Sequence, residues 1–148
     1  YDSETIIHQY KRLTNAFGKV KQLKLNYAVK ALSNISILKL FNSLDSGIDT
    51  VSIQEVQLGL KAGFEPANII FTPNGVSLEE IEKVSKLGVQ INIDNLSILE
   101  QFGTKHPKVP VCIRINPPSS LIFEIRAFCI NQLGVVHKCI FKKLKAFF

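Results

Sequence analysis

The feature that most constrains the fold is a regular alternation between short apolar stretches rich in Val and Ile and segments with helical periodicity. Alternation of this kind is typical of parallel βα units. A repeat of about 20 to 25 residues is short for a doubly wound sheet with long crossovers and favours a βα barrel. We therefore expect an α/β fold, a partial TIM-type (β/α) barrel of about five βα units, with strands near 23–29, 49–51, 68–72, 89–93 and 109–115.

The predicted helices between these strands carry start and stop signals. Ser52 is followed by Glu55, and Ser77 by Glu80. Each pair has the S-x-x-E spacing in which two side chains satisfy free backbone donors at a helix start. Left-handed helix ends favour glycine, which predicts helix ends at Gly63, Gly88 and Gly103.

Composition indicates a folded, soluble protein. The 148 residues are 46% hydrophobic and 20% charged, which is enough to form a core. No apolar run approaches the roughly 20 residues that cross a bilayer, and residues 1–11 do not resemble a signal peptide. Three cysteines, an odd number without a dense framework, fit a reducing compartment better than a disulfide scaffold. We expect a cytoplasmic protein without a membrane partner.

The net charge of +6 is unevenly distributed. Residues 1–120 contain 13 Lys and Arg against 11 Asp and Glu, whereas residues 121–148 contain 5 against 1. Most of the excess charge therefore belongs to the end of the chain, and a nucleic-acid partner is not expected.

The chain changes character after Pro117. Residues 118–148 lack the strand and helix punctuation of the preceding part and end in a basic run, 138–148. We expect two parts, 1–117 as the N-terminal part of a barrel and 118–148 as a divergent tail, of the kind that a shifted reading frame or a truncation produces. We expect the tail to pack poorly. An alternative is that 138–148 is a helix that binds a membrane surface or a partner.

Lys30 is the first candidate for chemistry. It ends the strand-like run 24–30, and the carboxyl ends of barrel strands are where catalytic groups lie. A poorly solvated lysine has a lowered pKa and can attack a carbonyl carbon. The alternative is a lysine whose amine extends from a strand end into water.

Three further residues are candidates. Asp49 falls on the next strand, where it lies beside Lys30 or acts as a turn residue. Glu55 is a capping-box acid, an active-site carboxylate, or both. Arg114 is the only charge in its strand, so it requires an anionic partner, either a ligand or a neighbouring carboxylate.

Other sites find little support in the sequence. The three histidines share no ligand spacing, and C-x-x-C pairs are missing, so no metal site is expected. No glycine-rich phosphate loop follows any predicted strand.

The segment Tyr-Ala-Val-Lys at 27–30 resembles the cofactor-lysine motif of the pyridoxal-phosphate-dependent ornithine, diaminopimelate and arginine decarboxylases, which have an alanine racemase-like barrel. The resemblance continues in order through the segments 47–52, 55, 62–64, 71–77, 91–95 and 114–117. It implies that Lys30 is the catalytic lysine that bonds pyridoxal 5'-phosphate, and that Asp49, Glu55 and Arg114 line the cofactor.

Within this family the segments resemble most closely the branch that acts on meso-diaminopimelate, releasing CO2 to give L-lysine. Ornithine and arginine decarboxylases resemble them less. The resemblance implies a lyase, an amino-acid substrate and, in intact members, a homodimer.

The family's ring-stacking histidine, phosphate loop, acid for the pyridine nitrogen and second domain follow the strand that contains Arg114, and none can be placed in 118–148. We therefore expect an N-terminal barrel fragment with little decarboxylase activity of its own. The alternative is a non-catalytic barrel relative, such as an antizyme-inhibitor-like binding protein.

Overall fold

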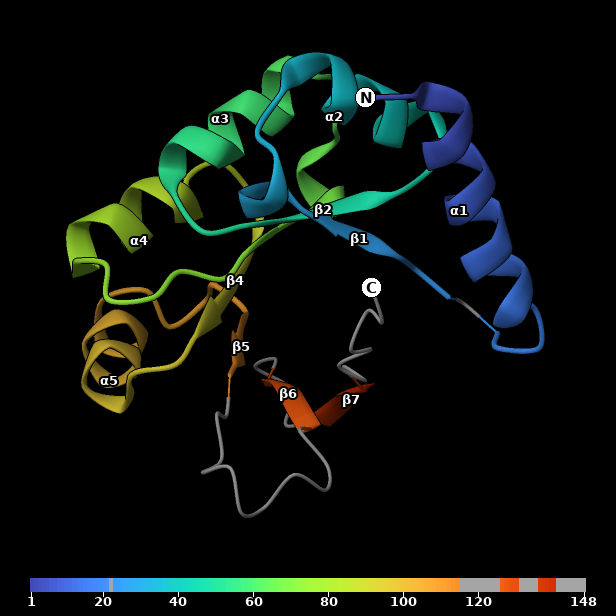
Figure 1. The fold of residues 1–148 in the computed structure, drawn as a ribbon. Coiled ribbons are helices and arrows are strands. Elements are labelled where there is room, and N and C mark those ends of the chain that lie inside the picture. The colour runs from blue at the N-terminus through green and yellow to red at the C-terminus, as the bar shows by residue number, and fades with distance from the viewer. Residues whose placement is uncertain (22, 115–125, 131–135, 141–148) are drawn as a thin grey trace. The chain divides into compact units, whose positions relative to one another are not determined.

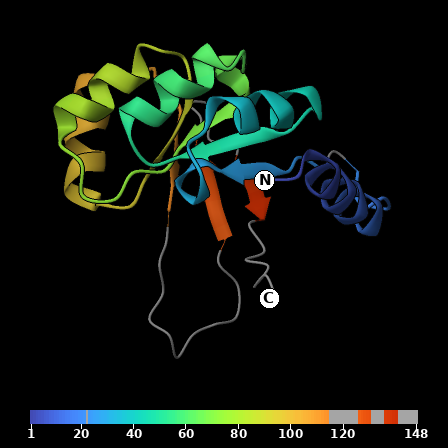
Figure 2. The ribbon, with the colours of Figure 1, turned by 45° about the horizontal axis from the view of Figure 1, so that its top comes forward.

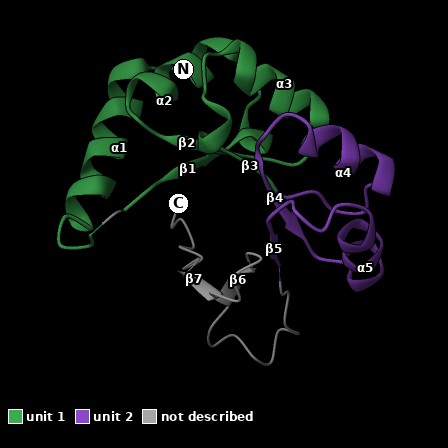
Figure 3. Cartoon of the chain, turned by 180° about the vertical axis from the view of Figure 1, so that it is seen from behind, with its two compact units in different colours: residues 1–71 green, residues 72–148 purple. Residues whose placement is uncertain are grey.

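The structure is a computed structural model that describes residues 1–21, 23–114, 126–130 and 136–140. The chain divides into two compact units, residues 1–71 and 72–148, which Figure 3 shows in green and purple. Each unit is described by itself. No helix among the described residues has the length and apolar character needed to span a membrane.

The first unit is built on three parallel strands. Its elements are α1 (Ser3–Ala16), β1 (Asn26–Ala28), the 3-10 turn η1 (Val29–Ala31), α2 (Ile35–Ser43), β2 (Gly47–Thr50), α3 (Ile53–Lys61), the 3-10 turn η2 (Pro66–Asn68) and β3 (Ile69–Phe71). β2 pairs in parallel with β1 on one side and with β3 on the other. In Figures 1 and 2, α2 and α3 lie over the same face of β1 and β2.

The two faces of this sheet have different roles. Ile48 of β2 is fully buried and lies against Gly59 of α3, which shows that it faces the helices. Because successive side chains of a strand point to opposite faces, Gly47 and Asp49 belong to the face away from α3. The core of the helix-covered face consists of fully buried apolar side chains, namely Val29, Leu38, Ile48, Val56, Ile69 and Phe71.

The second unit contains a parallel pair of strands extended by antiparallel strands. Its elements are α4 (Leu78–Ser85), β4 (Gln90–Ile93), α5 (Leu96–Lys105), β5 (Val111–Ile113), β6 (Arg126–Ile130) and β7 (Val136–Ile140). β4 pairs with β5 in parallel, whereas β5 with β6, and β6 with β7, are antiparallel.

In this unit too, apolar and polar side chains alternate along the strands. Ile91 and Ile93 are buried in a core with Ile81, Val84 and Phe102 of the two helices. Gln90 and Asn92 form a polar row on the other face. The Asn92 Nδ2 donates to Thr72 Oγ1 at 2.9 Å, and the Gln90 Nε2 donates to Cys112 Sγ at 3.2 Å. Cys112 is disulfide-bonded, a bond that the odd cysteine count did not predict.

The α/β class and the five predicted strands are confirmed, since each of β1 to β5 overlaps one predicted stretch. Ser52 and Ser77 are N-cap residues, and Gly63 and Gly88 have positive φ angles of 97° and 73°. The prediction for Gly103 is wrong. Gly103 lies inside α5, which continues to Lys105, because the residues that follow it still complete a helical turn.

The tail contains two strands, β6 and β7, which the sequence did not predict. Residues 138–140 belong to β7, so they are not part of the helix considered as an alternative for 138–148. The predicted boundary at 117, the rest of that basic run and the remaining tail residues lie outside the described residues.

Candidate functional site

Lys30 lies in η1, a 3-10 helix of one turn that directly follows β1. The sequence predicted the carboxyl end of the strand itself, and the strand ends two residues earlier, at Ala28. The turn is closed by the Leu32 amide, which donates to Val29 O at 3.0 Å. The Tyr27 hydroxyl also donates to Leu32 O, at 3.2 Å. Lys30 therefore lies just beyond the carboxyl end of β1.

The lysine side chain is exposed, which agrees with the second of the two interpretations, an amine that extends from the strand end into water. A 3-10 turn has about three residues per turn, which directs neighbouring side chains to different sides. Val29 takes the core position and is fully buried, which leaves Lys30 to solvent. Among the described residues the Lys30 amine forms no ion pair. It is therefore accessible to a carbonyl compound.

Asp49 lies on β2 and its Cα pairs with that of Ala28 of β1. It is half-buried, on the face away from α3. The predicted position on the strand next to that of Lys30 is confirmed. Because the two strands are parallel, their carboxyl ends place a carboxylate and an amine at the same edge of the first unit.

Glu55 caps the start of α3. Its backbone amide donates to Ser52 Oγ at 3.2 Å, and its Oε2 accepts from the Val51 amide at 2.8 Å. The predicted capping role is confirmed, with the difference that the carboxylate bonds the residue before the N-cap. The side chain is held at the loop between β2 and α3, on the same edge as Asp49.

Arg114 belongs to the second unit and follows the last residue of β5. Its amide donates to Ile93 O at 2.8 Å, so its backbone continues the pairing of β5 with β4. The side chain is exposed, and the expectation of a buried charge within a strand is wrong because β5 ends at Ile113. Arg114 lines a pocket of about 240 Å³ together with apolar side chains that include Leu96 and Leu99.

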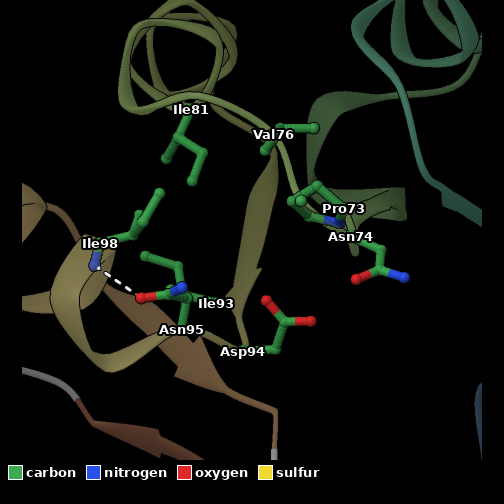
Figure 4. Close-up of a pocket in the computed structure, with 9 residues that line it drawn as sticks. Pro73, Asn74, Val76, Ile81, Ile93, Asp94, Asn95 and Ile98 are labelled. Atoms are coloured by element: carbon green, nitrogen blue, oxygen red, sulfur yellow. Dashed lines mark hydrogen bonds between the residues drawn. The ribbon is translucent and has the colours of Figure 1, made fainter.

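A second pocket of about 240 Å³ opens where β4 ends and α4 and α5 begin. Ile81, Ile93 and Ile98 form its apolar side, while Asn74 and Asp94 stand at its polar side (Figure 4). The Asn95 Oδ1 accepts from the Ile98 amide at 3.2 Å and caps α5.

Asn74 and Asp94 were not predicted as site residues. The available signal was their position, because each is a polar residue that follows closely after a strand. Asp94 lines each of these two pockets, whereas Arg114 lines only the pocket that Leu96 and Leu99 also line.

A group of three or more potential metal ligands does not occur among the described residues. His106 instead pairs with Glu82, with 3.2 Å between Nε2 and Oε1, and its ring lies 4.9 Å from that of Phe102.

Comparison with known proteins gives a consistent result. Residues 3–122 match the family profile described as pyridoxal-dependent decarboxylase, pyridoxal binding domain. The chain is 40% identical over 122 residues to diaminopimelate decarboxylase of Helicobacter pylori, which covers 79% of this chain and 30% of that protein. It is 35% identical over 118 residues to the diaminopimelate decarboxylase of Methanothermobacter thermautotrophicus, covering 78% and 28%. The chain thus spans less than a third of the length of these relatives.

Solved structures agree. The crystal structure of diaminopimelate decarboxylase from Helicobacter pylori complexed with L-lysine superposes with a TM-score of 0.70 at 39% identity, covering 79% of this chain and 31% of that one. Ornithine decarboxylase from Entamoeba histolytica gives a TM-score of 0.68 at 23% identity, covering 78% and 35%, which shows a shared fold. The expected likeness to the barrel of these decarboxylases is confirmed.

Proposed function

The chain belongs to the pyridoxal-dependent decarboxylase family, and on that premise we propose that it carries the cofactor-bonding lysine of an amino-acid decarboxylase, Lys30. The observation that supports this role most directly is the place of Lys30. It lies in the turn after β1, exposed and without an ion pair in the described part of the chain. A cofactor aldehyde requires such an amine.

The proposed substrate is meso-diaminopimelate, which the complete enzyme converts to L-lysine and CO2. Support comes from the degree of identity, which is 35% and 40% to two diaminopimelate decarboxylases. Structures of ornithine and arginine decarboxylases are 23% and 22% identical and support the fold alone.

We propose that Lys30, Asp49 and Glu55 of the first unit belong to a site for pyridoxal 5'-phosphate. The family domain is a pyridoxal-binding domain, and it covers Lys30, Asp49, Glu55 and Arg114. We propose that Asp49 stands beside the cofactor amine linkage and that Glu55, through its capping bond to the Val51 amide, fixes the loop that follows Asp49. For Arg114, which follows β5 in the second unit, we propose from the family resemblance alone that its cation binds an anionic group.

When bound, the cofactor supplies an electron sink for the electron pair left by departing CO2. In this proposal the residues of the chain bind and orient the cofactor. Lys30 provides the attachment point. Asp49 provides a negative charge at the same strand edge, which favours a protonated nitrogen there.

Several broader expectations remain proposals. We propose that residues 1–117 form the barrel part and 118–148 a separate tail. A homodimer and a cytoplasmic location are proposed from the family resemblance and the composition. The amino-acid substrate has support from the L-lysine complex of the Helicobacter pylori enzyme.

The cofactor assignment can be tested with pyridoxal phosphate and borohydride, which fixes the carbonyl carbon to an amine as a stable secondary amine. Mass spectrometry of the treated chain should find the label at Lys30. The label should be lost in Lys30→Ala and kept in Lys39→Ala, a control that removes another exposed lysine of the first unit. Equal labelling of many lysines, without preference for Lys30, would contradict the proposal.

A further inference from the structure

Leu32, the residue after the turn that contains Lys30, forms two hydrogen bonds, one through its amide and one through its carbonyl oxygen. The Leu32 amide donates to Val29 O at 3.0 Å, and the Leu32 carbonyl accepts from the Tyr27 hydroxyl at 3.2 Å. Tyr27 belongs to β1 and precedes Lys30 by three residues. Its side chain therefore bridges from the strand before the turn to the residue just after it.

The Tyr27 ring is itself held in place by the helix layer. It stacks on the ring of Phe41 in α2, with centroids 4.1 Å apart and planes inclined by 15°. Tyr10 of α1 meets the same Phe41 edge-on, with centroids 6.2 Å apart and an interplanar angle of 70°. Offset-stacked and edge-to-face contacts are the favourable geometries for aromatic pairs. The hydroxyl of Tyr27 is thus presented to Leu32 by a side chain with little freedom.

Burial also favours the protonated form of the Tyr27 hydroxyl, which is the form that can donate a hydrogen bond. Desolvation, together with the charge of Tyr1, raises the pKa of the Tyr27 phenol above its ordinary value of 10.0, against the opposing effect of the bond to Leu32. The phenol is therefore protonated throughout the neutral and mildly alkaline range.

We propose that Tyr27 is a positioning residue for Lys30: its hydroxyl, backed by Phe41, fixes the turn that presents the amine to the cofactor aldehyde. The inference rests on the proposed function of Lys30. Tyr27 does not touch the reacting atoms in this arrangement and acts through the backbone of Leu32. A contact with helix α2 thereby supports the turn that contains Lys30.

Tyr27→Phe is the appropriate variant, because it removes the hydroxyl and leaves the ring stacked on Phe41. Tyr10→Phe is the matched control, since it makes the same chemical change in the other ring that contacts Phe41. Two measurements are made on the full chain. One is amide hydrogen exchange of residues 29–32. The other is the ratio of borohydride-fixed pyridoxal phosphate on Lys30 to that on Lys39 in the same molecules.

Loss of one hydrogen bond of this kind shifts a local equilibrium by about five-fold. We expect Tyr27→Phe to speed exchange of the Leu32 amide by about that factor and to lower the Lys30 to Lys39 labelling ratio by about two- to five-fold. Tyr10→Phe should change neither. Thermal unfolding followed by circular dichroism establishes that both variants remain folded, and Tyr27→Phe is compared at a temperature well below its Tm.

The two proposals fail in different ways. Faster exchange with an unchanged labelling ratio would overturn the positioning role and leave Lys30 as the cofactor residue. An equal fall of the ratio in both variants would also overturn it, because the effect would then be general softening of the aromatic cluster. A wild-type chain that shows no preference for Lys30 would overturn the proposed function and this inference with it.

Discussion

At two glycines, Gly47 and Gly103, an added methyl group should have opposite effects on stability because its surroundings differ. A Cβ built at Gly47 would lie 1.9 Å from Asn26 Oδ1 and 3.0 Å from the backbone oxygen of Asn68. A Cβ at Gly103 would meet nothing within 4 Å. Gly47 is a residue of β2 paired with Asn26, and Gly103 is on the exposed side of α5.

Gly47→Ala should destabilise the chain by about 1–3 kcal/mol, because the methyl group forces Asn26 and the backbone at Asn68 apart. Urea denaturation measures the change in the free energy of unfolding. An unchanged midpoint would mean that Asn26 turns away without cost and that the close approach is not a packing constraint.

Gly103→Ala should have the opposite sign and stabilise by about 0.5–1 kcal/mol, because alanine loses less backbone entropy than glycine in a helix. Urea denaturation again measures the change in the free energy of unfolding. Destabilisation at this position would show that the helix does not continue through Gly103.

At the scale of single elements, the start of α3 depends on one hydroxyl. Ser52 Oγ accepts from the Glu55 amide, and Glu55 returns a bond to the backbone at Val51. Ser52→Ala should lower the free energy of unfolding by about 1 kcal/mol. Ser36→Ala, in the exposed first turn of α2, should change it by no more than about 0.5 kcal/mol. Equal effects of the two substitutions in a urea titration would argue against the cap.

The helices of the second unit are joined by a charged cluster. The Glu82 carboxylate of α4 lies 3.2 Å from both Lys105 Nζ, in the last turn of α5, and His106 Nε2, just beyond it. The hydrogen bond with His106, followed by that with Lys105, holds the pKa of Glu82 below its ordinary value of 4.5. A carboxyl whose pKa is depressed on folding stabilises the fold above its unfolded pKa, and this contribution disappears as the pH falls through the folded value.

Glu82→Gln should therefore reduce stability at about pH 7, and the difference from wild type should shrink as the pH falls below about 4.5. Urea denaturation across this range measures the difference in the free energy of unfolding. Glu100→Gln, an exposed carboxyl of α5 outside the cluster, should show no comparable pH dependence. A difference at Glu82 that is constant with pH would exclude the charge as its cause.

The sequence predicted elements well where the signal is local. The five strands and the caps at Ser52 and Ser77 follow from periodicity and from residues three positions apart. The end of α5 was mispredicted because a glycine stops a helix when the backbone takes a positive φ, and sequence does not reveal φ. The exposure of Lys30 depends on the 3-10 turn after β1, which no periodicity of two or of 3.6 predicts.

For the candidate site, the sequence predicted which strand a residue belongs to better than it predicted the burial of the residue or the pockets around it. Asp49 lies beside β1 as expected, since neighbouring parallel strands end together. Arg114 was assigned to the interior of a strand that ends at Ile113. Asn74 and Asp94 were missed because a pocket between loops is a property of packing rather than of residue spacing.

At the scale of the whole molecule, the chain spans 30% of its Helicobacter pylori relative. We expect the isolated 148-residue chain, supplied with pyridoxal phosphate and diaminopimelate, to release no more CO2 than Lys30→Ala. Labelling of an amine requires access alone. Decarboxylation requires a substrate bond aligned by several anchors, and such alignment contributes on the order of 7–11 kcal/mol to rate enhancement.

Radiolabelled CO2 capture measures the release with high sensitivity. Robust release that Lys30→Ala abolishes would show that the chain is sufficient for turnover. Labelling of Lys30 without release would be the expected combination.

Each of the five α-helices in the described residues starts at a polar side chain that bonds an amide two or three positions ahead. These residues are Asp2, Asn34, Ser52, Ser77 and Asn95. The start of each of these five helices is therefore specified by residues next to it, and for α2 to α5 these residues lie within the same strand–helix repeat. A duplication or deletion of one whole repeat leaves the other origins intact, and a repeat emerging from the ribosome has its starting point before its neighbour has been synthesised.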